Sequence, residues 1–215
     1  MQHLNIVLFI CMLISGTYGW SLSGRREFLR NVSTGAVLVS SAGLGTGTAV
    51  RANAAVVGAT QGSKAPLFEL PNSRGDGTTS LASLIKTGKW TVLYFYPGAF
   101  SKGCTLEARG FQRDISSYKE LNTQIVGVSV DPVEKNAQFC AAEGLDFYML
   151  SDAGGRVSNL YGSAMSIPGF GTFSNRQTYI IDPQGNLRWV FTDVESRIPR
   201  HSEEVISKLQ ELESL

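Results

Sequence analysis

The stretch that decides the fold is residues 91–96 (TVLYFY) followed by residues 97–104 (PGAFSKGC). The first six residues are apolar, β-branched or aromatic, and they stop at a proline, which predicts a buried strand. Beyond Cys104, apolar residues recur at helical spacing: Leu106, Ala108, Phe111, Ile115 and Tyr118. The pattern predicts a strand that runs through a tight loop into a helix, with a cysteine in the first turn of that helix.

The position of Cys104 suggests chemistry for its thiol. A helix N-terminus presents unpaired N–H groups and about half a positive charge. A thiol placed there is expected to ionise near or below neutral pH, and the thiolate is the nucleophilic form. The alternative interpretation is that Cys104 is only a small buried apolar residue.

Three blocks of the sequence resemble the peroxiredoxins. Pro97, Ser101 and Cys104 match the family signature of Pro, three residues, Ser or Thr, two residues and Cys. Residues 65–71 (APLFELP) resemble the opening strand of the family, and residues 175–182 (NRQTYIID) resemble its late strand with a catalytic arginine. The similarity covers the chain from about residue 63 onward and is strongest to the monomeric peroxiredoxin Q, or bacterioferritin-comigratory, branch.

This resemblance implies a fold and an activity. The fold is α/β and thioredoxin-like, with a mixed central sheet flanked by helices on both faces. The activity is reduction of hydrogen peroxide and organic hydroperoxides by a monomer that needs no cofactor or metal and is recycled by thioredoxin or a similar dithiol.

The resemblance also assigns roles to four residues. Cys104 would be the peroxidatic cysteine, and Arg176 would hold the thiolate charge and bind the peroxide. Ser101 would exchange hydrogen bonds with the peroxide, and Pro97 would shield the pocket from water. Two simpler interpretations stay open, namely that Arg176 forms an ordinary ion pair at a strand end and that Ser101 only caps a helix.

A resolving cysteine is implied as well. Many members of the branch carry it five positions after the first cysteine, where this chain has Arg109. Another subset carries it on the helix that contains Cys140, so the resemblance favours a Cys104–Cys140 disulfide. In the alternative, Cys140 packs in the core with Val133, Ala137 and Ala141, and an external thiol resolves Cys104.

The remaining pattern supports the same fold class. Strands are predicted at 124–130, 147–150, 176–182 and 187–192, and helices after Pro132 and at 156–161 and 202–212. Their alternation predicts a mixed sheet covered on both faces. The glycine-rich residues 162–174 are predicted to form a loop at the rim of the site, and His201 is predicted to be solvated beside a helix N-terminus.

The first 54 residues resemble a targeting leader. Residues 6–14 (IVLFICMLI) have the length of a signal-peptide core, and residues 24–30 (GRREFLR) resemble a twin-arginine export motif. Residues 52–54 (ANA) offer a cleavage site. This order resembles the compound leaders of algal plastid proteins and predicts the thylakoid lumen, with one peroxiredoxin domain at 55–215; alternatively, residues 35–50 form a helix of the mature protein.

Composition excludes several other classes. Of 19 basic and 18 acidic residues, removal of residues 1–54 takes four arginines and one glutamate, which leaves 15 and 17, or a net charge of −2. Neither nucleic acid nor an anionic membrane is therefore an expected partner, and no mature stretch is apolar enough to span a bilayer. Two cysteines and one histidine in residues 55–215 do not make a zinc site.

Two rival functions use the same cysteine. A thiol–disulfide oxidoreductase needs two cysteines at C-x-x-C spacing, but the first of those positions is Ser101. A redox sensor or chaperone-like binding protein would use the oxidation of Cys104 to change a binding surface.

Overall fold

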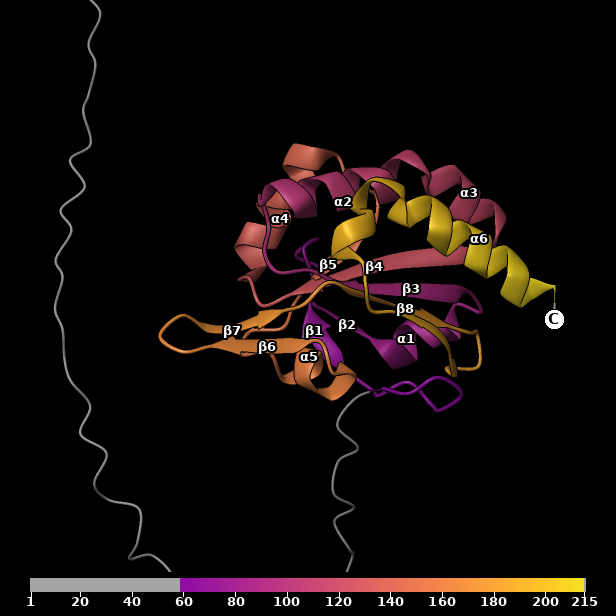
Figure 1. Ribbon diagram of the computed structural model, residues 1–215, viewed down its shortest axis with the longest axis horizontal. Helices are drawn as coiled ribbons and strands as arrows, with labels where there is room; N and C mark the ends of the chain where they lie inside the picture. The colour runs from indigo at the N-terminus through magenta and orange to yellow at the C-terminus, as the bar shows by residue number, and fades with distance from the viewer. Residues whose placement is uncertain (1–58, 215) are drawn as a thin grey trace, which may run out of the picture. The chain divides into compact units, whose positions relative to one another are not determined.

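A five-stranded mixed sheet forms the centre of the computed structural model, which describes residues 59–214. The strand order is β5-β4-β3-β8-β9. The first three of these run parallel and the last two run antiparallel to their neighbours (Figure 1): β5 Tyr148–Ser151, β4 Thr123–Ser129, β3 Trp90–Phe95, β8 Gln177–Ile181 and β9 Leu187–Phe191.

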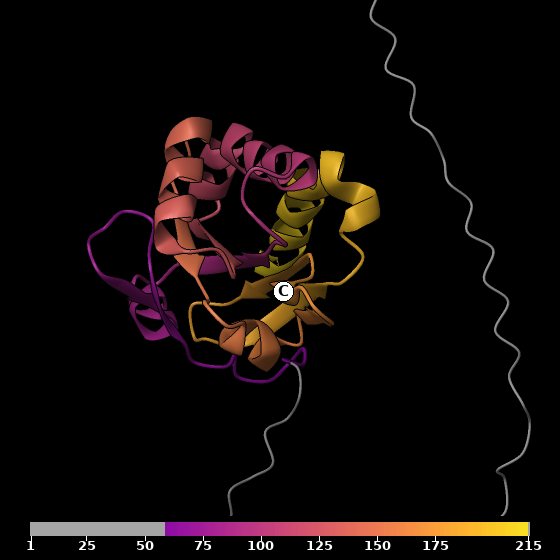
Figure 2. The same cartoon turned by 90° about the vertical axis from the view of Figure 1, so that its left-hand side faces the viewer.

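Helices cover both faces of this sheet (Figures 1 and 2). One face carries α2 Lys102–Arg113, α3 Ile115–Glu120, α4 Val133–Glu143 and α6 His201–Glu213. The other face carries α1 Leu81–Lys86 and α5 Arg156–Tyr161. The α/β class with a mixed, doubly covered sheet is therefore confirmed. No helix in the described part of the chain is long and apolar enough to cross a membrane.

The central strand β3 explains why its sequence is a continuous apolar run. Val92 and Tyr94 are fully buried in the core under α2, α4 and α6, while Leu93 and Phe95 are fully buried in the core of the opposite face. A strand with no solvated face cannot alternate between apolar and polar residues. Each such side chain contributes about 1.5–3 kcal/mol by its burial, so this one strand anchors both layers.

Two small hairpins lie beside the main sheet. The strands β1 Glu69–Pro71 and β2 Thr78–Ser80 flank the polar turn expected between residues 71 and 79. The prediction of a loop at 162–174 is wrong, because β6 Ala164–Ile167 and β7 Gly171–Ser174 pair there. This hairpin projects from the body of the protein (Figure 1). Pro168 and Gly169, with φ +81° at the glycine, make the reversal that lets the two arms pair.

The helices also differ from the predicted pattern in places. The helix expected to continue from Cys104 to Tyr118 is interrupted at Asp114, where α2 ends and α3 begins. Leu106, counted among the apolar residues of that helix, is 47% exposed.

The sequence pattern predicts that Cys140 lies on the buried face of α4, but the structure buries a different face of this helix. Asn136 and Phe139 are buried, Cys140 is half-buried and Ala141 is exposed. An asparagine takes the most buried place because hydrogen bonds satisfy its amide, and an apolar pattern does not reveal that.

His201 is buried, and the prediction that it is solvated was wrong. Its ring is 1% exposed, packs edge-on against Phe111 and Phe191, and has Nε2 2.8 Å from Thr178 Oγ1. It lies one turn before the buried Val205 of α6 and therefore on the same helix face. Burial lowers the pKa of His201 to about 4, and the nearby Arg197 and Arg176 charges act in the same direction.

The lowered pKa of His201 predicts how the free energy of unfolding changes with pH. Because the folded pKa lies below the ordinary value of 6.5, the contribution of neutral His201 is present above pH 6.5 and is lost as the pH falls toward 4. His201→Gln should therefore reduce the acid-induced loss of unfolding free energy over this range by about 3 kcal/mol. Urea unfolding at a series of pH values measures the difference, and parallel curves for parent and variant would contradict it.

The predicted leader at 1–54 and its boundary with a domain at 55–215 lie outside the described residues.

Candidate active site

The loop between β3 and α2 places Cys104 in the first turn of α2. Ser101 is the N-cap residue, with an extended backbone, and its Oγ accepts a hydrogen bond from the backbone N–H of Cys104 at 3.4 Å. The Cys104 side chain is buried, with 2% of the residue exposed. The sulfur is thus held out of bulk water at the positive end of a twelve-residue helix.

Arg176 lies immediately before β8 and reaches the same turn of α2. Its Nη1 donates to Glu107 Oε2 at 2.7 Å, and its Nε donates to Glu195 Oε2 at 2.6 Å. The ion pairs suggested as an alternative role are therefore present. The third nitrogen, Nη2, lies beside Gly103, only 2.7 Å from where a Cβ on that residue would stand.

The charge on Arg176 responds to this environment. Burial alone would lower the pKa of the guanidinium, but Glu107 and the Cys104 sulfur together raise it above the ordinary value. The guanidinium therefore stays positive and lies close to the sulfur. The arrangement brings together Cys104, Ser101 and Arg176. Pro97 lies two residues after the end of β3 and is half-buried.

Glu107 is the site residue that the sequence interpretation missed. It lies one helical turn after Cys104, and its carboxylate is almost wholly buried. Burial raises the pKa of Glu107 to about 7, against the opposing effect of Arg176. The spacing carried a signal, because residues 104, 107, 108 and 111 share the buried face of α2. An acid on such a face needs a buried cation as its partner.

Cys140 lies on α4, and its thiol is hydrogen-bonded to Ser73. Its Sγ donates to Ser73 Oγ at 3.2 Å, and the residue borders a surface cavity of about 440 Å³ that Arg74 also lines. Burial raises the pKa of the Cys140 thiol, an effect that Ser73 and Arg74 partly oppose. Cys104 and Cys140 are both free thiols.

The site therefore presents a buried cysteine sulfur, a candidate nucleophile, beside a positively charged guanidinium. A guanidinium can stabilise negative charge that develops during a reaction. Among residues 59–214, no group of three or more His, Cys, Asp or Glu side chains could hold a metal ion.

The sequence is similar to a known protein family and to curated members of it. Residues 61–190 match the AhpC/TSA family. The chain is 33% identical to the chloroplastic peroxiredoxin Q of Triticum aestivum over 152 residues, which is 71% of this chain and 67% of the relative. It is 32% identical to the chloroplastic peroxiredoxin Q of Sedum lineare over 163 residues, which is 76% of this chain and 84% of that one.

Solved structures show the same similarity. Peroxidoxin BcpB from Mycobacterium tuberculosis superposes with a TM-score of 0.65 at 30% identity, over 71% of this chain and 97% of that one. A Xanthomonas campestris bacterioferritin comigratory protein, described for its alkyl peroxide reduction activity, superposes with a TM-score of 0.61 at 25% identity. The superposition covers 67% of this chain and 90% of that one.

A substitution at Gly103 tests whether the Arg176 guanidinium must lie against the first turn of α2. Gly103→Ala should push Arg176 Nη2 away and slow the alkylation of Cys104 at neutral pH by about tenfold, as expected when one charged hydrogen bond is weakened. Gly110→Ala in the same helix is the matched control, since its new Cβ would meet only Ser202 Cβ at 3.7 Å. Mass spectrometry of the alkylated peptide measures the rate, and equal rates in both variants would contradict the assignment.

Proposed function

The chain belongs to the AhpC/TSA family, and we propose that it is a thiol peroxidase of the peroxiredoxin Q type that reduces hydrogen peroxide and small organic hydroperoxides. One observation carries this proposal: a buried cysteine at a helix N-terminus shares its turn with the buried guanidinium of Arg176. The alkyl peroxide reduction described for the Xanthomonas campestris protein supports organic hydroperoxides as substrates.

In the first step the Cys104 thiolate attacks one oxygen of the peroxide. An S–O bond forms as the O–O bond breaks, the sulfur is oxidised to a sulfenic acid, and the other oxygen leaves as hydroxide or alkoxide and takes up a proton. Arg176 stabilises the negative charge on sulfur and on the departing oxygen through its fork of donors. The Ser101 hydroxyl holds the peroxide O–H, and Pro97 limits the access of water.

In the second step Cys140 attacks the oxidised sulfur. An S–S bond forms between Cys104 and Cys140, and the sulfenic oxygen leaves as water. The Cys104 sulfur is thereby reduced and the Cys140 sulfur is oxidised, so that both are at the disulfide level. A dithiol such as thioredoxin then reduces the disulfide by thiol exchange and restores both thiols. The Cys140 thiol donates to Ser73 Oγ in the reduced protein, so this bond breaks in the second step. A disulfide also needs the two Cα atoms within about 7 Å, and we expect α4 to open locally to allow that approach.

The nucleophile is tested by Cys104→Ser. Serine is nearly isosteric and keeps the core filled, but its hydroxyl is not ionised at neutral pH, so peroxide consumption should fall below a few per cent of the parent. Stopped-flow oxidation of the reduced protein by hydrogen peroxide is the measurement, and unchanged far-ultraviolet circular dichroism is the control. Substantial residual activity would show that another group is the nucleophile.

The role of Cys140 is tested by Cys140→Ser. The first oxidation should proceed at the parental rate, because Cys140 is not among the groups that contact the peroxide. Thioredoxin-linked turnover should stop, and Cys104 should over-oxidise to the sulfinic form. Peptide mapping after one equivalent of peroxide follows both outcomes. A parent that yields only sulfenic or intermolecular species would belong to the one-cysteine type.

We also place the mature protein in the plastid, in the thylakoid lumen. The chloroplastic relatives support the plastid, and the twin-arginine segment at Arg25 and Arg26 supports the lumen. Replacement of both arginines with lysine in a reporter fusion should leave the reporter in the stroma, where fractionation of isolated plastids would find it. A reporter that still reached the lumen would exclude the twin-arginine route.

A further inference from the structure

The loop before Cys104 contains a strained residue. Phe100 has φ +68°, in the left-handed region that a bulky side chain avoids at a cost of about 1–3 kcal/mol. The ring is 49% exposed and contacts Phe139 of α4 edge-on, with 5.3 Å between ring centroids. Half-burial of one ring does not fix a strained backbone by itself, so other contacts must hold the loop in this conformation.

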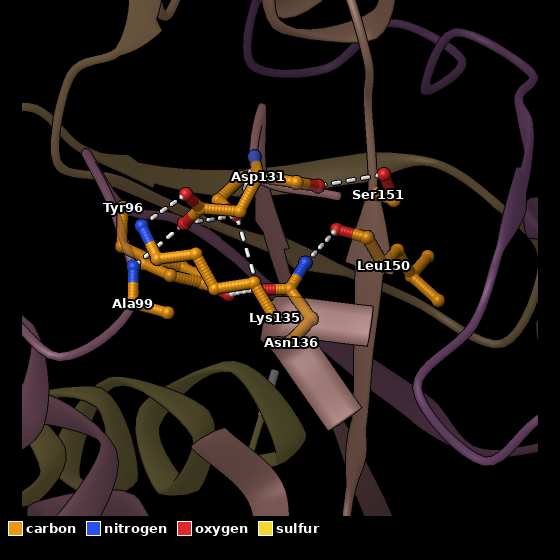
Figure 3. Close-up of polar contacts among 8 residues, drawn as sticks. Tyr96, Ala99, Asp131, Lys135, Asn136, Leu150 and Ser151 are labelled. Carbon is orange, nitrogen blue, oxygen red and sulfur yellow. Dashed lines mark hydrogen bonds and ion pairs between the residues drawn. The ribbon is translucent and has the colours of Figure 1, made fainter. Parts of the chain in front are cut away.

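The contact that holds the loop comes from Asp131, which follows β4. Its Oδ2 accepts a hydrogen bond from the backbone N–H of Ala99, the residue before Phe100, at 2.6 Å (Figure 3). Together with the Ser101 cap on Cys104, this bond fixes the loop on both sides of the strained residue. A charge-assisted hydrogen bond of this kind is about twice as strong as a neutral one.

Asp131 is itself held in place by its neighbours (Figure 3). Ser129 Oγ donates to the Oδ2 atom at 3.1 Å, Lys135 Nζ donates to Oδ1 at 2.6 Å, and Ser151 Oγ donates to the backbone carbonyl of Asp131 at 2.6 Å. The carboxylate therefore has a fixed orientation toward the loop, although Asp131 is only two residues ahead of α4 in the chain.

The direction of this side chain is informative. Its two carboxylate oxygens bond to different segments: Oδ2 accepts from Ala99 in the loop before Cys104, and Oδ1 accepts from Lys135 in the first turn of α4. Asp131 caps no backbone N–H of α4, whose N-cap residue is Pro132. One oxygen of the carboxylate is therefore directed at the loop that precedes Cys104.

We propose that Asp131 is a positioning residue for peroxide reduction, an inference that rests on the proposed peroxidase function. Asp131 acts through Ala99 and contacts no reacting atom. It holds the backbone of the loop in the strained conformation that places the Ser101 hydroxyl at the first turn of α2. Without this bond the loop relaxes, and the Ser101 hydroxyl is no longer held at the first turn of α2 beside Cys104.

The test compares two reactions of Cys104 in the reduced full-length protein. Asp131→Ala should lower the second-order rate constant for oxidation by hydrogen peroxide by about tenfold to a hundredfold, the effect expected when a site is misplaced by ~1 Å. Alkylation by iodoacetamide, which needs no peroxide pocket, should fall much less. The ratio of the two rates therefore separates positioning from general destabilisation.

Three further variants locate the cause. Asp131→Asn keeps an oxygen acceptor for Ala99 and should retain most of the peroxide rate. Lys135→Met removes one of the bonds that orient the carboxylate but keeps the acceptor for Ala99, so it should lower the peroxide rate much less than Asp131→Ala. Asp182→Ala is the matched control, because Asp182 is also a buried turn aspartate that accepts backbone N–H bonds, from Gln184 and Asn186. It should lower stability without changing the ratio.

Each outcome decides one question. A parent protein that peroxide does not oxidise at Cys104 would overturn the proposed function, whatever Asp131 does. A fast parent with an unchanged rate ratio in Asp131→Ala would overturn the positioning role alone. If Asp131→Ala does not fold, Ser129→Ala removes the hydroxyl that orients the carboxylate and should show the same selective fall to a smaller degree; an unchanged ratio there would also overturn the role.

Discussion

The buried ion pair between Arg176 and Glu107 is the constraint on which the arrangement of the site depends. The two side chains are 6% and 1% exposed, so each charge has lost its water and relies on the other. Removal of one partner from such a pair costs about 3–5 kcal/mol, because the remaining charge stays buried and unpaired. The pair therefore joins the start of β8 to α2 next to Cys104, and it does so across a long separation in the chain. Gly103 follows from the same constraint, since only a residue without a side chain leaves room for the guanidinium.

On the other side of Cys104, the loop is attached to the segment that leads into α4. Tyr96 donates its hydroxyl hydrogen to Asn136 Oδ1 at 2.7 Å, and Asp131 holds Ala99. In the proposed second step, Cys140 gives up its hydrogen bond to Ser73 before it bonds to Cys104. The N-terminus of α4 has no side-chain cap. A capping side chain would stabilise the helix by about 1 kcal/mol. Asp131 bonds both to the loop before Cys104, through Ala99, and to the first turn of α4, through Lys135.

The parts of the fold that the sequence predicted are those specified by local pattern. β3, β4, α5 and the β8–β9 hairpin follow from apolar runs, helical spacing and turn residues, all of which a short window contains. Family motifs mark Cys104, Ser101 and Arg176, and the structure brings these three residues together, while their catalytic roles stay a prediction. The parts that were missed are buried polar residues: Glu107, Asn136 and His201. Each has a hydrogen-bond partner distant in the chain, namely Arg176, Tyr96 and Thr178 respectively, although Glu107 Oε1 and His201 Nδ1 have none among residues 59–214. No local pattern specifies such a partner.

The same buried pair explains how an acid can lie one turn from a cysteine that must carry negative charge. A carboxylate near the sulfur would oppose the thiolate, because like charges in a poorly solvated site raise each other's energy. The positive charge of Arg176 offsets this repulsion, because Nη1 bonds to Glu107 and Nη2 lies beside the first turn of α2. Burial raises the pKa of Glu107, and the Arg176 charge opposes this shift. Arg176 also pairs with the largely exposed Glu195 through Nε, so Nε, Nη1 and Nη2 each face a different neighbour. Glu107 therefore fixes the position of the guanidinium beside the sulfur that the proposed reaction uses.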